Sequence, residues 1–175
     1  TSGRAVEGVE VLIMDPEGNE VARGEPGEIV VRGYNVMKGY FEDDAQTQET
    51  IDAQGWLHTG DIGMMNADGY LRITDRKKDM FIVGGFNCYP AEIERSMLQN
   101  ENLVQVAVIG VPDERMGEVG MAFVIPREDV SVSAQELVNW CRDRMANYKV
   151  PHYVEVVDSL PFNAIGKVQK FILRK

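Results

Sequence analysis

The chain has 175 residues, of which 44 % are hydrophobic and 26 % are charged, as in ordinary soluble globular proteins. This length can bury one good core or two small ones, and the longest apolar run, residues 104–111, is far short of the roughly 18 residues that cross a bilayer. Residues 1–75 hold 5 basic and 15 acidic side chains, whereas residues 76–175 hold 13 of each, which together give the net charge of −10. The acidic first part argues against a nucleic-acid-binding protein, while the basic end of the chain permits a small polyanionic ligand.

The first 75 residues are predicted to be rich in β-structure. Short alternating segments are separated by turn residues, and residues 66–69, Asn-Ala-Asp-Gly, are typical of a hairpin. A short helix is expected to begin with Asp43 or Asp44 as its N-cap and to run to Thr50. The expected strands are Val9–Asp15, Glu28–Arg32, Ile62–Met65 and Tyr70–Thr74. Short strands with close turns predict part of a barrel or sandwich.

After residue 75 the pattern changes to alternating strands and helices. Pro90 is well placed as the first residue of a helix whose apolar stripe contains Ile93 and Met97. A second helix is expected to begin at Ser133, with Glu136 completing a capping box. The expected strands are Met80–Val83, Val104–Val111, Gly120–Ile125 and Tyr153–Val157. The sequence therefore predicts an α+β fold, with a β-rich, barrel-like part at residues 1–76 and a compact α+β domain at residues 77–175.

The two cysteines, Cys88 and Cys141, are too few for a disulfide framework. Neither has His or Cys partners at metal-ligand spacing, so we expect no metal site. Cys141 lies four residues after Leu137 on a helical pattern, which predicts a buried core thiol, whereas Cys88 follows a Gly-Gly pair in a predicted loop and is expected to be more exposed. A reducing cytoplasm is the expected location.

Several segments, in the same order and at similar spacing, together resemble the adenylate-forming superfamily. This superfamily contains acyl-CoA and aryl-CoA ligases, luciferases and the adenylation domains of peptide synthetases. The matching segments are Gly33–Tyr40, Gly55–Asp61, Thr74–Gly85, Pro90–Glu94 and Leu160–Lys167. Each segment alone is modest evidence, but their spread over most of the chain makes the resemblance specific.

The resemblance implies a two-step reaction. A carboxylate attacks the α-phosphate of ATP to give an acyl-adenylate and pyrophosphate, and the thiol of CoA then displaces AMP to give a thioester. In such enzymes a small C-terminal domain swings about a hinge between the two steps. Residues 1–76 then correspond to the last subdomain of the large AMP-binding domain, and residues 77–175 to the mobile C-terminal lid domain. The family's phosphate loop and acyl pocket lie upstream, so the fragment alone is expected to be inactive.

Three residues match family positions for adenylation and nucleotide binding. Lys167 matches the catalytic lysine, whose ammonium bridges the carboxylate and the α-phosphate and relieves the repulsion between these anions. Asp61 matches the aspartate that accepts hydrogen bonds from the ribose hydroxyls of ATP or AMP. Arg76 matches the arginine whose planar fork donates to ribose and phosphate oxygens. Without the resemblance, each residue has a simpler interpretation: Lys167 as a solvated loop lysine, Asp61 as part of a Thr-Gly-Asp turn and Arg76 as a solvated linker arginine.

Three further residues match positions of the domain rotation and of CoA binding. Lys78 falls at the hinge, where its backbone dihedrals would absorb the rotation and where proline would restrict it. Gly84 and Gly85 match the glycines that line the pantetheine tunnel, where the lack of a Cβ lets CoA lie close to the backbone. A turn before the following helix explains the same glycines without any ligand.

Some positions depart from the family pattern. Met116 stands where many relatives place a tryptophan against the pantetheine path, and Val150 and His152 stand where some relatives use basic residues to hold the CoA phosphates. The contacts to CoA phosphates are therefore left open. Ile82 occupies the position at which luciferases carry a lysine for their oxidative chemistry, which counts against light emission.

The leading hypothesis is the C-terminal part of an ATP-dependent acyl-CoA ligase that activates a fatty or hydrophobic aryl acid. The expected partners are ATP or AMP with Mg²⁺ bound mainly by the missing N-terminal part, CoA as co-substrate, the acid, and the missing N-terminal domain, against which the chain would pack. A homo-oligomer is left open, and no transmembrane segment is expected. Two alternatives remain, an adenylation domain that loads a carrier protein and a non-catalytic interaction module that kept the lid fold. Residues 75–85 favour a ligase acting on CoA, and the retention of Asp61, Arg76 and Lys167 argues against a pure binding module.

Overall fold

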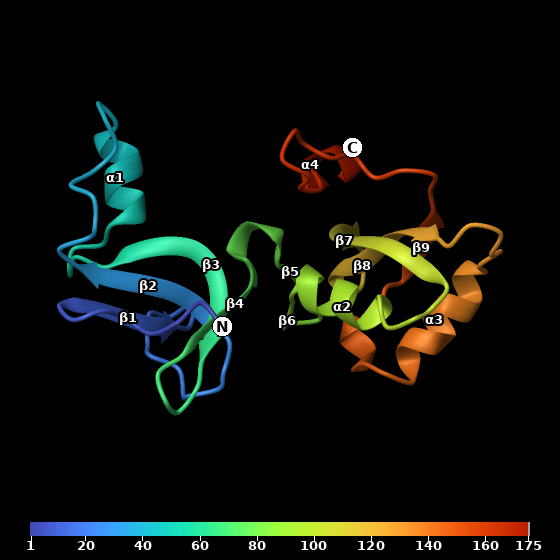
Figure 1. The fold of residues 1–175 in the computed structure, drawn as a ribbon, viewed down its shortest axis with the longest axis horizontal. Coiled ribbons are helices and arrows are strands. Elements are labelled where there is room, and N and C mark those ends of the chain that lie inside the picture. Colours follow the sequence, from blue (N-terminus) through green and yellow to red (C-terminus); the bar gives the residue numbers. More distant parts are fainter. Residues whose placement is uncertain (175) are drawn as a thin grey trace. The chain divides into compact units, whose positions relative to one another are not determined.

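The computed structural model describes residues 1–174, so Lys175, the last residue of the second predicted domain, lies outside it. The chain forms two compact units, Thr1–Lys78 and a unit that starts at Asp79 (Figure 1). This division falls two residues after the predicted boundary, which lay between residues 76 and 77. Each unit has its own sheet, and helices occur in both, so the predicted α+β class is confirmed.

The first unit is built on an antiparallel sheet with the strand order β1-β2-β3-β4. The strands are β1 (Val9–Met14), β2 (Gly27–Gly33), β3 (Leu57–Met65) and β4 (Leu71–Arg76), and the helix is α1 (Asp44–Thr50). Its core contains Ile13, Ile29 and Met65. Within residues 1–174 this sheet is open at both ends, so the barrel-like part of the prediction is not confirmed.

Local signals in the first unit act as the sequence predicts. Asp43 is the N-cap of α1, and its carboxylate accepts a hydrogen bond from the backbone N–H of Gln46 at 2.9 Å. The turn between β3 and β4 is held by Asn66, whose side-chain oxygen accepts from the N–H of Tyr70 at 2.8 Å. The predicted hairpin is therefore confirmed, although both strands are longer than expected.

The second unit is built on a sheet in the order β6-β5-β8-β7, with β9 added beside β8. Only the β8–β9 pairing is parallel among the pairings of this sheet within residues 1–174. Its strands are β5 (Phe81–Val83), β6 (Phe86–Cys88), β7 (Leu103–Asp113), β8 (Gly117–Pro126) and β9 (Tyr153–Val156), and its helices are α2 (Pro90–Met97), α3 (Ala134–Arg142) and α4 (Lys170–Leu173). Within residues 1–174 there are two 3-10 helices, η1 (Lys77–Asp79) at the boundary between the units and η2 (Asn147–Lys149) in the second unit.

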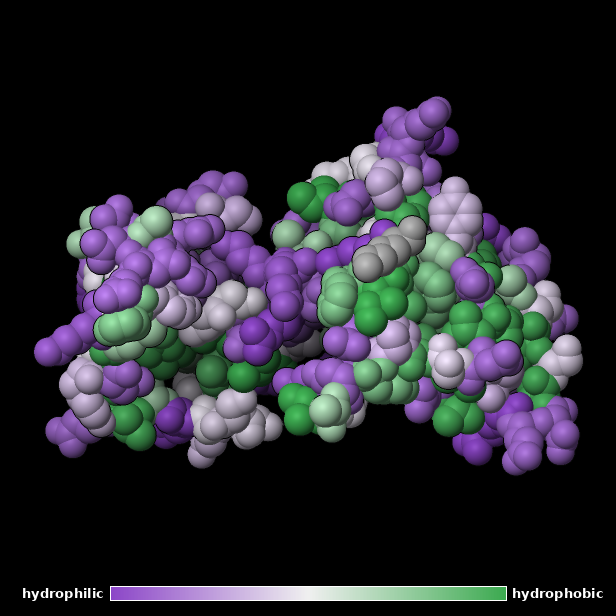
Figure 2. Space-filling model, turned by 90° about the horizontal axis from the view of Figure 1, so that it is seen from above, coloured by the Kyte–Doolittle hydropathy of each residue, from purple (hydrophilic) through white to green (hydrophobic). Residues whose placement is uncertain are grey.

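Both faces of this second sheet are covered. Alternate residues of β7 point to opposite faces, so Val106 and Val108 join a core with α2 and α3, while Ala107 and Ile109 join a smaller cluster with Leu160 and α4. Figure 1 shows α2 and α3 on one side of the sheet and α4 on the other. Figure 2 shows hydrophobic groups reaching the surface of this unit among polar ones.

Two local expectations for the second unit are wrong. Ser133 is the N-cap of α3, but its side chain makes no capping hydrogen bond, so the predicted capping box is not formed. Cys88 is fully buried rather than exposed, because β6 turns its side chain into the core, where its thiol donates to the carbonyl of Tyr148 at 3.3 Å. Cys141 is buried as expected, and burial raises the pKa of both thiols to about 11.

Pro90 occupies the first turn of α2 as predicted, and Ile93 and Met97 of this helix are buried. No helix within residues 1–174 is long and apolar enough to span a membrane.

Candidate functional site

The segment Thr59–Asp61 forms a bulge in β3. Glu28 and Val30, two residues apart on β2, pair with Ile62 and His58 of β3, so the three residues between these two pairs have no ladder partner on β2. Gly60, in the middle of this segment, has a φ of +69°, in the left-handed region that glycine adopts without strain. The bulge redirects the backbone at Asp61, which stays paired with β4, as bulges beside functional sites commonly do.

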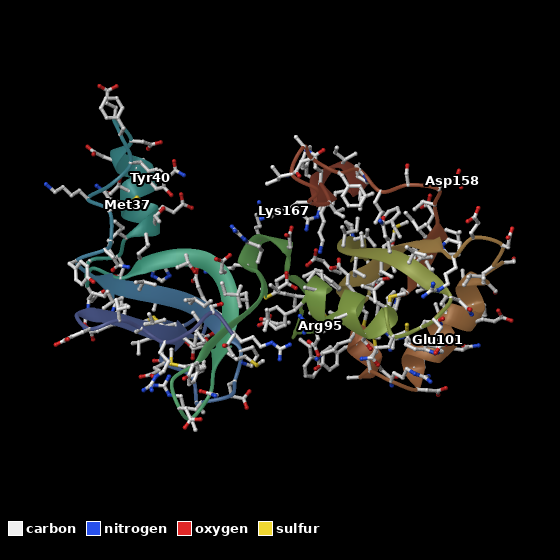
Figure 3. The ribbon with its side chains drawn as sticks, in the orientation of Figure 1. Met37, Tyr40, Arg95, Glu101, Asp158 and Lys167 are labelled. Atoms are coloured by element: carbon white, nitrogen blue, oxygen red, sulfur yellow. The ribbon has the colours of Figure 1, made fainter. Side chains whose placement is uncertain are left out.

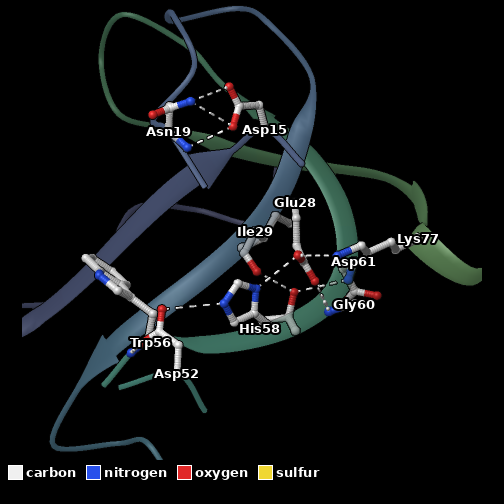
Figure 4. Close-up of polar contacts among 11 residues, drawn as sticks. Asp15, Asn19, Glu28, Ile29, Asp52, Trp56, His58, Gly60, Asp61 and Lys77 are labelled. Atoms are coloured by element: carbon white, nitrogen blue, oxygen red, sulfur yellow. Dashed lines mark hydrogen bonds and ion pairs between the residues drawn. The ribbon is translucent and has the colours of Figure 1, made fainter. Parts of the chain in front are cut away.

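The carboxylate of Glu28, whose side chain is only 10 % exposed, fills the space beside this bulge (Figure 4). Its Oε2 accepts from Nζ of Lys77 at 2.8 Å and lies 3.0 Å from Nδ1 of His58. Its Oε1 accepts from the N–H of Gly60 at 3.2 Å. The opposite ring nitrogen of His58, Nε2, lies 3.6 Å from a carboxylate oxygen of Asp52. The Glu28 side chain thus joins the bulge, the ring of His58 at the start of β3 and Lys77, the residue that follows β4.

The environment of Glu28 favours its charged form. Burial alone would raise the pKa of this carboxyl, but the hydrogen bonds from Lys77 and His58 outweigh burial and hold the pKa below its ordinary value of 4.5. Because a charge removed from water is costly unless it is paired and hydrogen-bonded, these donors are required for Glu28 to stay where it is.

Asp61 and Arg76 form an ion pair at the edge of the same sheet. They are directly paired on β3 and β4, and Nε of Arg76 lies 2.7 Å from Oδ1 of Asp61. The arginine side chain is 56 % exposed and the aspartate side chain 23 % exposed. A carboxylate offers about four acceptor sites and a guanidinium five donors, so the pair retains hydrogen-bonding capacity toward a ligand.

A cavity of about 780 Å³ lies beside these groups in the first unit. The predicted residues Arg76 and Lys78 line it, and Asp61 pairs with the first of them. The other lining residues are Glu28, Tyr40, Gln46, Glu49, Thr50, His58, Thr59, Gly60 and Lys77. Most of these residues have polar side chains, whose donors and acceptors suit a ligand rich in hydroxyl and phosphate groups.

Gly84 and Gly85 form the turn between β5 and β6, with φ values of +55° and +88°. Both values favour glycine, so the turn alone explains the two residues. A Cβ on Gly84 would come within 2.7 Å of Cε of Met116, which shows that the methionine side chain lies against this turn. The predicted role of the glycines in CoA binding stays a prediction.

Lys167 lies exposed on a loop between β9 and α4 (Figure 3). The side-chain oxygen of Asn163 accepts from the N–H groups of Ile165 and Lys167 at 3.1 and 2.8 Å, which shapes the loop around Gly166 with its φ of +76°. Within residues 1–174 the structure gives the ammonium of Lys167 no carboxylate partner. Local hydrogen bonds thus order the backbone of the loop, while the ammonium group of Lys167 stays exposed to solvent.

The structure brings Asp61, Arg76 and Lys78 together in the first unit, whereas Gly84, Gly85 and Lys167 belong to the second. Sequence analysis missed the residues that organise the first group, which are Glu28, His58 and Lys77. An acidic residue directly before the apolar residues Ile-Val-Val of a predicted strand was the available signal for Glu28. Within the described residues, 1–174, no three His, Cys, Asp or Glu side chains lie close enough together to hold a metal ion.

Two protein-family models match the chain. Residues 1–41 match the model described as AMP-binding enzyme, and residues 92–167 match the model described as AMP-binding enzyme C-terminal domain. The second match ends on Lys167.

Curated relatives match along the whole chain. A 3-[(3aS,4S,7aS)-7a-methyl-1,5-dioxo-octahydro-1H-inden-4-yl]propanoyl:CoA ligase of Rhodococcus jostii is 53 % identical over 100 % of this chain, and 32 % of the relative is covered. A long-chain-fatty-acid–CoA ligase of Escherichia coli O157:H7 is 45 % identical over 98 % of this chain, and 30 % of it is covered. The chain thus spans about a third of the length of the curated relatives it matches.

Solved structures also match along almost the whole chain. The ATP-bound form of MatB from Rhodopseudomonas palustris has a TM-score of 0.91 and 39 % identity over 98 % of this chain and 34 % of that one. The o-succinylbenzoate CoA synthetase MenE from Bacillus subtilis, in complex with the acyl-adenylate OSB-AMP, has a TM-score of 0.84 and 36 % identity over 97 % of this chain and 34 % of that one.

The Glu28 network makes a prediction about acid stability. Because the pKa of Glu28 is below 4.5 in the folded chain, its stabilising effect is present above about pH 4.5 and is lost as the pH falls through the folded value. We expect Glu28→Gln to lower the free energy of unfolding of the first unit by about 1–3 kcal/mol at neutral pH. The difference from the unchanged chain should shrink at acid pH, where both forms lack the charge.

The two tryptophans allow this to be measured one unit at a time. Trp56 lies in the first unit and Trp140 in the second, so urea unfolding followed by fluorescence in a Trp140→Phe background reports on the first unit. Glu10→Gln is the matched control, because it breaks the exposed Glu10–Arg32 pair of the same sheet and should change stability much less. A difference for Glu28→Gln that stays constant as the pH falls from about 7 to about 2.5 would contradict the assigned role.

Proposed function

Because the chain belongs to the adenylate-forming superfamily of AMP-binding enzymes, we propose that it is the C-terminal part of an ATP-dependent, AMP-forming acyl-CoA ligase. The observation that carries the proposal is the ion pair between Asp61, in the bulge of β3, and Arg76, on β4, beside a cavity lined mostly by polar side chains. The curated relatives of the chain are named CoA ligases. The larger protein would join a carboxylic acid to CoA through an acyl-adenylate. The isolated chain would be inactive, because the phosphate loop and the acyl pocket lie outside it.

In the first step Asp61 and Arg76 would hold the nucleotide. The carboxylate of Asp61 accepts hydrogen bonds from the two ribose hydroxyls, a task that suits a group with acceptor sites only. Arg76 keeps this carboxylate in place through its Nε and turns its remaining donors toward ribose and phosphate oxygens. The cavity beside the pair supports this assignment because hydroxyl and amide groups from β3 and α1 line it.

Lys167 would supply the positive charge at which adenylation occurs. The attacking carboxylate and the α-phosphate are both anions, and charge builds on the phosphoryl oxygens as they meet. An ammonium between them relieves the repulsion. The exposed position of Lys167 at a loop tip supports the proposal, because the side chain can enter a site formed by the rest of the protein.

In the second step CoA would attack the acyl-adenylate after the lid domain has turned about Lys78. We assign the pantetheine path to the Gly84–Gly85 turn, with Met116 as its neighbouring wall. We assign the Mg²⁺ that accompanies ATP mainly to the missing N-terminal part of the ligase. A reaction that consumes ATP and CoA fits the cytoplasm, which we propose as its location.

The acid would be fatty or ring-bearing. Curated relatives are named for a bicyclic propanoate, for long-chain fatty acids and for ferulate, all of which combine a carboxylate with a large apolar body. A carrier-protein thiol as the acceptor remains the alternative to CoA, and a thioester assay with each acceptor distinguishes the two.

Replacement of Lys167 tests the proposed chemistry. In the full-length ligase, Lys167→Ala should lower acid-dependent ATP–pyrophosphate exchange by about two to three orders of magnitude, since a preorganised charge is lost. Thioester formation from a supplied acyl-adenylate should fall much less, because that step does not need the ammonium. Arg95→Ala, which removes another exposed positive charge from the second unit (Figure 3), is the control and should leave exchange near its original rate. Equal loss of both half-reactions in Lys167→Ala would rule out the assigned role.

Proline at the proposed hinge tests the domain rotation. Lys78 lies in η1, and Lys78→Pro fixes its φ near −65° and also restricts the preceding residue. We expect the ratio of thioester formation to adenylation to fall at least about tenfold, because only one of the two domain positions stays accessible. Lys78→Ala removes the side chain but leaves the backbone free, so its ratio should change far less. An undiminished rate of thioester formation in Lys78→Pro would refute the hinge.

A further inference from the structure

The loop that carries Lys167 is a short hairpin. Phe162 pairs with Val168, and the N–H of Asn163 donates to the carbonyl of Lys167 at 2.9 Å. A two-stranded hairpin of this size is only marginally stable in water. Its position on the second unit must therefore be set by the attachments at its two ends.

The end before the loop is held by apolar contact. Leu160 is 5 % exposed and packs against Ala107, Ile109 and Phe123 on the sheet. Hydrophobic burial is strong but non-directional, so it keeps the loop on the sheet without fixing its orientation.

The end after the loop is held by a charged group in addition to apolar contacts of Val168 and Leu173 with the same cluster. Nζ of Lys170, in the first turn of α4, lies 2.8 Å from Oε1 of Glu94 on α2. The same oxygen accepts from the N–H of Val108 on β7 at 2.8 Å. One carboxylate therefore ties α4 to both a helix and a strand of the unit. A second pair, Arg174 with Asp79 at 3.5 Å, adds a weaker tie.

The Glu94–Lys170 pair differs from an ordinary surface salt bridge. The side chains are only 19 % and 15 % exposed, and the carboxylate also takes a backbone hydrogen bond. Charge-assisted bonds of this kind are directional, and removing one partner leaves a poorly hydrated charge unpaired, which exposed pairs do not suffer. The pair thus supplies the orientation that the apolar contacts on both sides of the loop do not fix.

We propose that Glu94 and Lys170 are positioning residues that hold the Lys167 loop in the geometry that adenylation requires. The proposal rests on the proposed function, in which Lys167 acts in the first half-reaction. Neither residue touches the substrate. Glu94 belongs to the segment Pro90–Glu94, which resembles the family and to which no nucleotide or CoA contact has been assigned. Because a displacement of about 1 Å can cost about 100-fold in rate, loosening this anchor should be visible in the kinetics.

Two substitutions remove the ion pair with little other change. Glu94→Gln keeps an oxygen that can accept from the N–H of Val108 but removes the charge opposite Lys170. Lys170→Met keeps most of the aliphatic stem but removes the ammonium. The matched control is Glu92→Gln on the same helix, which breaks the Glu92–Lys149 pair of 2.6 Å without touching α4.

In the full-length ligase each variant, and the double variant, is assayed separately for acid-dependent ATP–pyrophosphate exchange and for thioester formation from a supplied acyl-adenylate. We expect Glu94→Gln and Lys170→Met each to lower kcat for exchange about 10- to 100-fold, with little change in the KM for ATP. The double variant should lose no more than either single one, since both remove the same interaction. Thioester formation should change less than about threefold in all three variants, and Lys170→Arg should recover most of the exchange.

Unchanged exchange in both single variants would overturn the proposal, as would equal loss of both half-reactions, which marks a purely structural anchor. A full-length protein without any exchange refutes the proposed function instead. In that case a second measurement still tests whether Glu94 holds the Lys167 loop in place. In the 175-residue chain, Glu94→Gln should speed amide hydrogen exchange across residues 161–169 about tenfold relative to Glu92→Gln. Equal exchange in the two variants would show that Glu94 does not hold the loop.

Discussion

A single, nearly buried carboxylate, that of Glu28, organises the first unit around the candidate nucleotide site. A charge in this position is tolerated only because Lys77, His58 and the backbone of Gly60 all donate to it or lie within bonding distance. The same bonds fix the bulge from which Asp61 projects and the point at which the chain leaves β4. The residue next to the proposed hinge is therefore clamped to the sheet, so that rotation, if it occurs at Lys78, starts from a fixed base.

In the second unit, too, a carboxylate that is shielded from water holds separate elements together. Glu94 is a partly buried carboxylate that joins three elements, and α4, only four residues long, could not hold its place by helix propensity alone. In both units a shielded carboxylate bonds to a short segment, and the exposed side chain for which a function is proposed lies a few residues away. Rigid support and a free charged tip are what an enzyme needs when one lysine must be delivered to a separate site.

The sequence predicts the parts of this fold that depend on periodicity and on turn residues. Val104–Val111 is recognisable as a buried strand, and Asn66–Gly69 as a hairpin, because burial and turn geometry dictate residue types locally. Strand β5 was predicted at Met80–Val83, but β6 was missed because a strand of three residues carries almost no periodic signal, and the burial of Cys88 was missed with it. Glu28 and Glu94 were not recognised as anchors because their partners lie 49 and 76 residues away in the sequence.

The central claim is that this chain supplies the lysine and some of the nucleotide-binding residues of an adenylating site, and that the phosphate loop of this site lies elsewhere in the protein. ATP–pyrophosphate exchange that depends on a carboxylic acid tests this claim most directly. The full-length protein and the 175-residue chain are compared at equal concentration, with a fatty acid and a ring-bearing acid as substrates. We expect exchange from the full-length protein with at least one acid and none from the chain alone. Measurable exchange by the chain alone, or none from the full-length protein with any carboxylic acid, would contradict the proposed division of the active site.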